Sequence, residues 1–136
     1  MSRIVIDTCV LKRAYHGEDD VSGRGIESIK RKRHTVVVCP SLFWEYVLVL
    51  SNGDRSMYRV IYDLLWYKWL RLPREERLDP NVRISFGPPE DRLHMQLAID
   101  SGAQCHVSTD NGVLAEACNM RQYGVTEVHP ANCVPC

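Results

Sequence analysis

Residues 3–11 read RIVIDTCVL, and this stretch decides the fold. The β-branched run Ile4-Val5-Ile6 predicts a buried strand, and Asp7 ends it before a more helical segment begins. The same change from an apolar run to a polar helix start returns at residues 35–39, TVVVC, and at residues 104–108, QCHVS. Since strands alternate with helices, the sequence predicts a parallel sheet with helices on both faces.

The remaining elements follow from apolar periodicity and from the places of Pro and Gly. They comprise a polar loop over 17–25, a short basic helix ending at 33, helices over 42–50, 55–70 and 88–101, a charged connector over 73–80, strands over 82–84 and 125–128, and a helix beginning at 110. We find no repeats and no low-complexity tract.

Length and composition set the class of protein. The chain has 136 residues, which suits a single domain over 1–136. Lys+Arg and Asp+Glu both number 17, so the formal net charge is zero and gives no global attraction to a polyanion. No apolar run approaches the ~20 residues of a membrane span, and the first residues do not resemble a signal peptide. We therefore expect a cytoplasmic protein without a membrane partner. Free thiols are the simplest interpretation of its six cysteines, and disulfides stay open as the alternative.

Two aspartates follow apolar strands and precede helices. Asp7 and Asp110 should both lie at the carboxyl edge of the sheet, where open parallel sheets bind ligands. Each of them also suits a helix N-cap, which Asp forms well. Two such residues at one edge favour a shared site over two separate caps.

Glu45 lies in a helix that is apolar on every side, within the sequence LFWEYVLVL at residues 42–50. Burying an unpaired carboxylate is costly, so a cation or a basic partner is expected. The helix leaves the end of the second strand and should carry Glu45 over the edge that holds Asp7. Asp91 is weaker on its own, because an acid in the first turn of a helix commonly complements the helix dipole.

Three segments together resemble the PIN domain nucleases. They are IVIDTCVL at residues 4–11, PSLFWE at residues 40–45, and DRLHMQLAIDSGAQCHVSTD at residues 91–110. The resemblance implies a three-layer α/β/α sandwich with a central parallel sheet of four to five strands. It departs from the family at Cys9, where Asn is usual, and at Ser108, where Thr is usual.

The resemblance places the acidic quartet of the family on Asp7, Glu45, Asp91 and Asp110. It implies an endoribonuclease that hydrolyses phosphodiester bonds with Mg²⁺ or Mn²⁺, ions that suit oxygen-rich sites. Metal ligation is expected from Asp7, Asp91 and Asp110, and Glu45 is expected to orient water or a second ion. Without a cation, four carboxylates would repel one another and the phosphate.

RNA is the substrate that the resemblance implies. The toxins of toxin–antitoxin pairs are similar proteins, so an antitoxin is a further partner that the resemblance implies. A homodimer is expected from the apolar 55–70 segment, including Trp66 and Trp69. The basic run at 30–34 is typical of a solvated helix end, and phosphate contacts could instead come from Arg55, Arg59, Arg71, Arg74 and Arg77. Two alternatives stay open: a non-catalytic protein- or RNA-binding module, and a housekeeping RNA-processing nuclease.

Overall fold

The structure, a computed structural model, describes residues 2–50, 56–65, 69–71 and 89–132. Its centre is a five-stranded sheet in the order β3-β2-β1-β4-β5, and every neighbouring pair is parallel. The strands are β1 (Arg3–Ile6), β2 (Thr35–Val38), β3 (Trp69–Arg71), β4 (Cys105–Val107) and β5 (Thr126–Val128). The first strand in the sequence is therefore the middle strand of the sheet.

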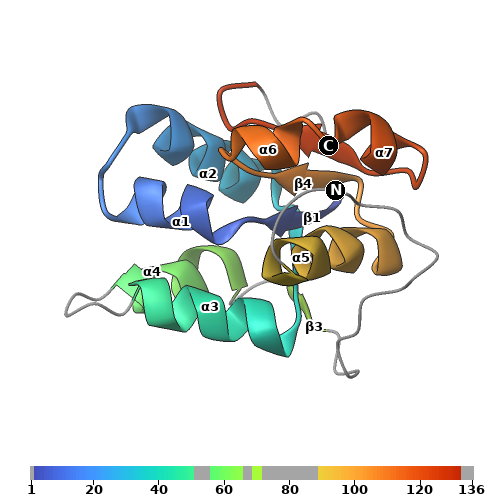
Figure 1. The fold of residues 1–136 in the computed structure, drawn as a ribbon. Helices are drawn as coiled ribbons and strands as arrows, with labels where there is room; N and C mark the ends of the chain where they lie inside the picture. Colours follow the sequence, from blue (N-terminus) through green and yellow to red (C-terminus); the bar gives the residue numbers. More distant parts are fainter. Residues whose placement is uncertain (1, 51–55, 66–68, 72–88, 133–136) are drawn as a thin grey trace.

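Helices cover both faces of this sheet, as predicted. Figure 1 shows α6 and α7 on one side and α3 and α5 on the other. The helical elements are α1 (Thr8–Tyr15), α2 (Asp20–Lys32), α3 (Pro40–Leu50), α4 (Ser56–Val60), a π-helical turn (Ile61–Leu65), α5 (Pro89–Asp100), α6 (Asn111–Leu114) and α7 (Ala117–Arg121). The fold is the predicted α/β/α sandwich.

The core is built from strand residues that are buried on both faces of the sheet. Ile4, Val5 and Ile6 of β1 are fully buried, and Val36 to Val38 of β2 are almost so. Continuous apolar runs of this kind are typical of a parallel strand with helices on both sides. Within the described ranges, no helix has both the length and the apolar character that crossing a membrane requires.

Helix α2 begins earlier than the sequence indicated. Residues 20–25 were expected in a loop, but the helix starts at Asp20 because the side chain of Asp19 caps it, accepting a hydrogen bond from the Ser22 N–H at 2.6 Å. Two of the glycines that suggested a loop, Gly23 and Gly25, lie inside the helix. At Gly25 the reason is steric, since a Cβ there would lie 2.8 Å from Cβ of Pro130.

The helix expected over 55–70 was wrong at residues 69–70. The helical segment ends at Leu65, and Trp69 belongs to β3, which pairs with β2 through Val36. The connector expected over 73–80 and the strand expected over 82–84 lie outside the described residues. Of the two states left open for the cysteines, Cys105 adopts the disulfide-bonded one.

Candidate metal centre at the end of the central strand

Asp7 stands at the carboxyl end of the central strand. Its backbone N–H donates to the carbonyl of Val107 at 2.8 Å, which extends the β1–β4 pairing by one residue. Asp7 occupies the N-cap position of α1, yet its side chain makes no capping hydrogen bond. Instead, Oδ2 accepts a hydrogen bond from the Ser108 hydroxyl at 2.8 Å. Capping therefore does not explain this carboxylate, which is turned towards the end of β4.

Glu45 reaches the same place from α3. The next residue, Tyr46, is fully buried and donates its hydroxyl to the carbonyl of Ile6, the residue before Asp7. Burial, and next the negative charge of Asp7, raise the pKa of the Tyr46 hydroxyl well above its ordinary value. The hydroxyl therefore keeps its proton and holds α3 against the end of β1. This contact sets Glu45 beside Asp7.

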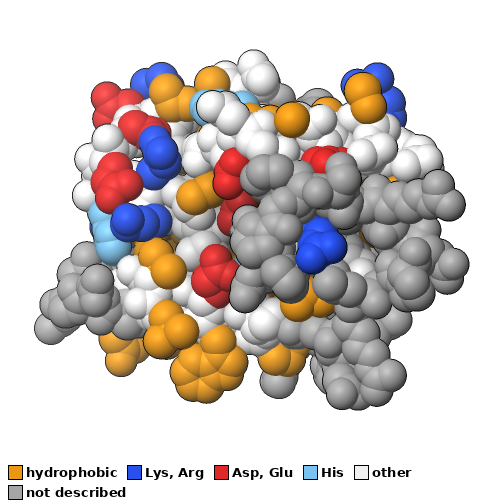
Figure 2. All heavy atoms as spheres, in the orientation of Figure 1, with side chains coloured by type: hydrophobic (Ala, Val, Ile, Leu, Met, Phe, Trp, Pro, Cys, Tyr) orange, Lys and Arg blue, Asp and Glu red, His pale blue; other side chains and the backbone are white. Residues whose placement is uncertain are grey.

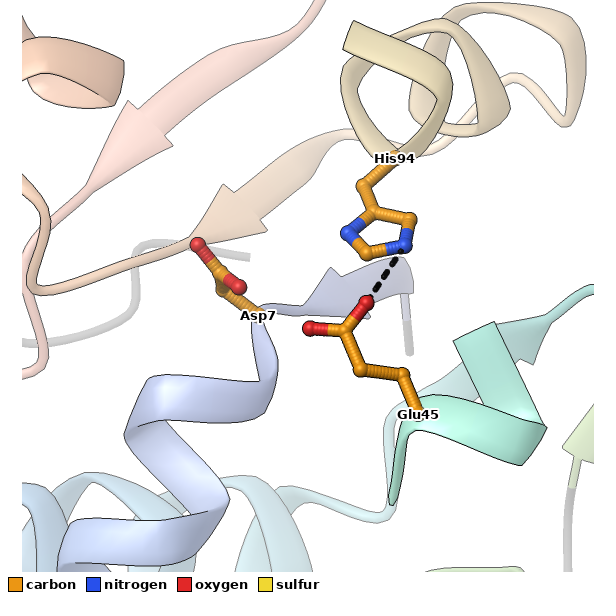
Figure 3. Close-up of side chains that lie close together, drawn as sticks. All are labelled: Asp7, Glu45 and His94. Atoms are coloured by element: carbon orange, nitrogen blue, oxygen red, sulfur yellow. Dashed lines mark ion pairs between the residues drawn. The ribbon is translucent and has the colours of Figure 1, made fainter. Parts of the chain in front are cut away.

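His94 completes the cluster from a third element, α5. Its side chain is 2% exposed, and its Nε2 lies 3.2 Å from Oε2 of Glu45, which is 35% exposed. One ligand-type atom from each of Asp7, Glu45 and His94 lies within 4.8 Å of the others. Figure 3 shows the three side chains converging from the end of β1, from α3 and from α5. The cluster joins residues that are far apart in the sequence.

The donor set of this cluster fits a divalent cation. The carboxylates of Asp7 and Glu45 would repel each other in a largely buried place, and a cation between them removes that repulsion. Two carboxylates and an imidazole are all ligands that divalent metals accept. Figure 2 shows acidic side chains near the centre of the face that it draws. Asp7, Glu45 and His94 are therefore the residues that could hold a metal ion.

Asp110 is linked to this cluster by hydrogen bonds, and its side chain also caps a helix. It is exposed, and its Oδ1 accepts a hydrogen bond from the Gly112 N–H at 2.9 Å, which caps α6. Its own N–H donates to the Ser108 hydroxyl at 3.0 Å. A chain of hydrogen bonds thus runs from Asp110 through Ser108 to Asp7. Asp91 lies in the first turn of α5, and its side chain is outside what the structure describes.

Cys9 replaces the usual Asn of the resembled family and keeps a polar contact. The Thr109 hydroxyl donates to Sγ of Cys9 at 3.1 Å. Burial, followed by the charge of Asp7, raises the pKa of the Cys9 thiol. Cys9 is therefore a neutral thiol that links the loop after β4 to α1, rather than a thiolate ligand.

Lys30 of the basic run and Arg59, one of the possible phosphate contacts, are both engaged within the chain. Lys30 pairs with Asp63 at 3.6 Å, and the guanidinium of Arg59 lies 5.2 Å from the ring centroid of Tyr15. The Tyr15 hydroxyl in turn donates to Asp63 at 3.1 Å. These contacts tie α1 and α2 to the 56–65 segment. The other candidates lie outside the described side chains: Arg55, Arg71, Arg74 and Arg77.

His94 was not predicted as a site residue from the sequence. A lone histidine in an apolar helix face is ordinarily a core residue, and residues 94–98 are indeed all buried. The available signal was its position three residues after Asp91, because residues at that spacing share one face of a helix. With Asp91 proposed to face the metal, His94 should have been considered with it.

Comparison with known families agrees with this geometry. The family model of the PIN domain matches residues 3–112. The matched segment includes the cluster residues Asp7, Glu45 and His94, and also Asp91 and Asp110. No match to a curated protein was found.

Proposed function

The chain belongs to the PIN domain family, and on this basis we propose that it is a metal-dependent endoribonuclease that hydrolyses phosphodiester bonds in RNA. The observation that carries the proposal is the buried carboxylate of Asp7. It stands in a capping position without capping, and it meets Glu45 and His94 at the carboxyl edge of the sheet. Membership in the family indicates a nuclease, and the cluster supports a metal centre.

The proposed roles follow from the positions of the acids. Asp7 and Asp110 would hold Mg²⁺ or Mn²⁺, Asp91 would bind it directly or through water, and Glu45 would orient the attacking water. When bound, the ion supplies charge neutralisation at the phosphate and activates water. Ser108 fixes the carboxylate of Asp7 at Oδ2, so that its other oxygen can face the ion.

The substitution Asp7→Asn tests this proposal. Asn keeps the shape of the side chain and can still accept the Ser108 hydrogen bond, but it removes the charge that attracts the cation. RNA cleavage in Mg²⁺ or Mn²⁺ should fall by more than the ~10–100-fold that loss of an outer-shell partner costs. Without metal, relief of the repulsion between Asp7 and Glu45 should raise the melting temperature.

Melting curves and cleavage of a labelled RNA would measure both effects. Mn²⁺ at a hundredfold excess over its dissociation constant should stabilise the wild type by about 2.7 kcal/mol, and Asp7→Asn much less. Asp19→Asn, at the N-cap of α2, is the matched control and should behave like the wild type. Equal cleavage and equal metal shifts in Asp7→Asn and the wild type would refute the assignment and favour a non-catalytic binding module.

We also propose a homodimer and, in the toxin interpretation, an antitoxin partner. The support is a patch of large exposed apolar side chains on α3 and the 56–65 segment: Trp44, Leu48, Tyr58 and Tyr62. Figure 2 shows hydrophobic side chains along the lower edge of the molecule, where Figure 1 places α3 and α4.

A small neighbouring gene encoding a DNA-binding N-terminus and an amphipathic tail would favour a toxin; its absence would favour housekeeping RNA processing.

A further inference from the structure

The two ring nitrogens of His94 have different surroundings. Nε2 contacts Oε2 of Glu45 at 3.2 Å. Nδ1 is also buried, and it has no hydrogen-bond partner among the described residues. In Figure 3, the nitrogen without a dashed line, which is Nδ1, lies on the side of the ring that faces Asp7. Buried polar atoms are normally satisfied, so this nitrogen requires an explanation.

The contact with Glu45 decides what Nδ1 can do. An Nε2–H that donates to the Glu45 carboxylate fixes the tautomer and leaves Nδ1 with a lone pair. That lone pair faces the carboxylate of Asp7, which is also an acceptor. Two acceptors that face each other in a buried place need a cation, or a bridging donor, between them. Histidines that bind metals commonly donate their second nitrogen to a carboxylate in this way.

We propose that Nδ1 of His94 is a metal ligand together with Asp7, that Glu45 orients the imidazole through Nε2, and that the nitrogen ligand makes the site prefer Mn²⁺ over Mg²⁺. This inference rests on the proposed function, because it concerns the same centre. Mg²⁺ takes oxygen ligands and dehydrates reluctantly. First-row transition metals accept imidazole nitrogen, and Mn²⁺ also suits the carboxylate of Asp7. A mixed nitrogen and oxygen centre therefore selects differently from the acidic quartet.

The variants His94→Gln and His94→Asn separate a ligand from a positioning residue. The amide of Gln reaches the place of Nε2 and keeps the contact with Glu45, but leaves nothing at Nδ1. The amide of Asn reaches the place of Nδ1 and loses the contact with Glu45. Calorimetric titration with Mn²⁺ and with Mg²⁺ gives the ratio of the two affinities. In the wild type we expect Mn²⁺ to bind at least about tenfold more tightly, and in His94→Gln this preference should be lost, by roughly 10–100-fold.

Pulsed electron paramagnetic resonance of Mn²⁺ bound to the wild type provides a readout that needs no variant. A directly coordinated imidazole nitrogen should give a hyperfine coupling to the ion, and His94→Gln should lack it. The inference is overturned if the wild type shows no such coupling, or if His94→Gln keeps the wild-type affinity ratio. In that case His94 only positions Glu45, or a water molecule occupies the space beside Nδ1.

The same measurements separate this inference from the proposed function. A wild type that shows nitrogen coupling but cleaves no RNA supports the ligand and refutes the nuclease. A wild type that cleaves RNA while His94→Gln keeps its metal preference refutes the ligand alone. A wild type that binds neither ion refutes both.

Discussion

The hydroxyl of Ser108 connects two aspartates at the ends of neighbouring strands. It donates to Oδ2 of Asp7 at 2.8 Å and accepts from the N–H of Asp110 at 3.0 Å. Ser108 is fully buried, and its own N–H donates to the carbonyl of Val128 at 3.0 Å. The backbone of the sheet thus holds this hydroxyl, and the hydroxyl in turn orients the carboxylate of Asp7.

Removing that hydroxyl should weaken metal binding without removing a charge. We expect Ser108→Ala to lower Mn²⁺ affinity by about 10–100-fold, as other losses of an outer-shell partner do. The N–H of Asp110 would also lose its acceptor, which costs stability of about 1–3 kcal/mol. Titration calorimetry and denaturant unfolding measure the two effects. Ser108→Thr keeps a hydroxyl and should bind as the wild type does; a Ser108→Ala protein with unchanged affinity would contradict this role.

Single residues were predictable where their surroundings conflicted with their chemistry. Glu45 was found because a carboxylate among apolar residues needs a partner, and it does meet His94 and Asp7. The sequence could not tell which of Asp7 and Asp110 caps a helix, because both suit a cap. His94 was missed because burial and ligation favour the same apolar surroundings for a histidine. Only the packing of α5 against the sheet brings its ring to Glu45.

At the level of elements, the path of α2 depends on a glycine inside the helix. Gly25 is buried, and an added Cβ would lie 2.8 Å from Cβ and 3.4 Å from Cα and the carbonyl oxygen of Pro130. The proline ring and its backbone cannot move as the end of a flexible side chain can. The helix therefore approaches the segment after β5 more closely than a larger residue would permit.

Gly25→Ala should destabilise the protein, although alanine is the better helix former. Overpacking costs about 1–3 kcal/mol, against a helix gain of about 0.5–1 kcal/mol. We expect a net loss of about 1–2 kcal/mol in the free energy of unfolding, measured with urea. Gly23→Ala is the matched control, because a Cβ there has no atom within 4 Å, and it should stabilise by about 0.5–1 kcal/mol. If both variants were stabilised, the close approach would be disproved.

Elements were predictable where local and tertiary preferences agree. The sequence runs of β1 and β2 are too apolar for a surface position, and they predict strands in the centre of the sheet. The start of α2 was predicted wrongly because Gly25 serves a close packing contact that only the folded chain contains. Trp69 was wrongly predicted to be helical because it follows the helical spacing of the preceding residues by chance. Its pairing with β2 places it in a strand.

At the level of the whole molecule, α3 exposes the apolar face that the sequence suggested would be buried. Leu42, Tyr46 and Leu50 face the core, whereas Trp44 is 63% and Leu48 is 73% exposed. Tyr58 and Tyr62 of the adjacent 56–65 segment are also exposed and enlarge this apolar surface. The sequence had placed the interface on residues 55–70, and the structure adds α3 to the part of that segment that it describes.

The proposed homodimer predicts that this patch controls the association state. Trp44→Ser combined with Leu48→Ser should weaken the dimer by about 2 kcal/mol or more, roughly thirtyfold in the dissociation constant. Sedimentation at micromolar concentration would show the shift to monomer. Arg121→Ser, on the exposed surface of α7, should leave the dimer intact. A wild type that sediments as a monomer at this concentration would exclude the dimer.

The central position of β1 also bears on how the protein is made. Ile4 pairs with Val36 on one side and with Cys105 on the other, so the middle of the sheet is completed by a strand from late in the chain. A chain leaves the ribosome with its N-terminus first. Asp7 is therefore synthesised before His94 and Ser108, and the cluster cannot form until these two residues have emerged. While translation is still in progress, the proposed nuclease would lack its finished centre and could not yet cut the message that encodes it.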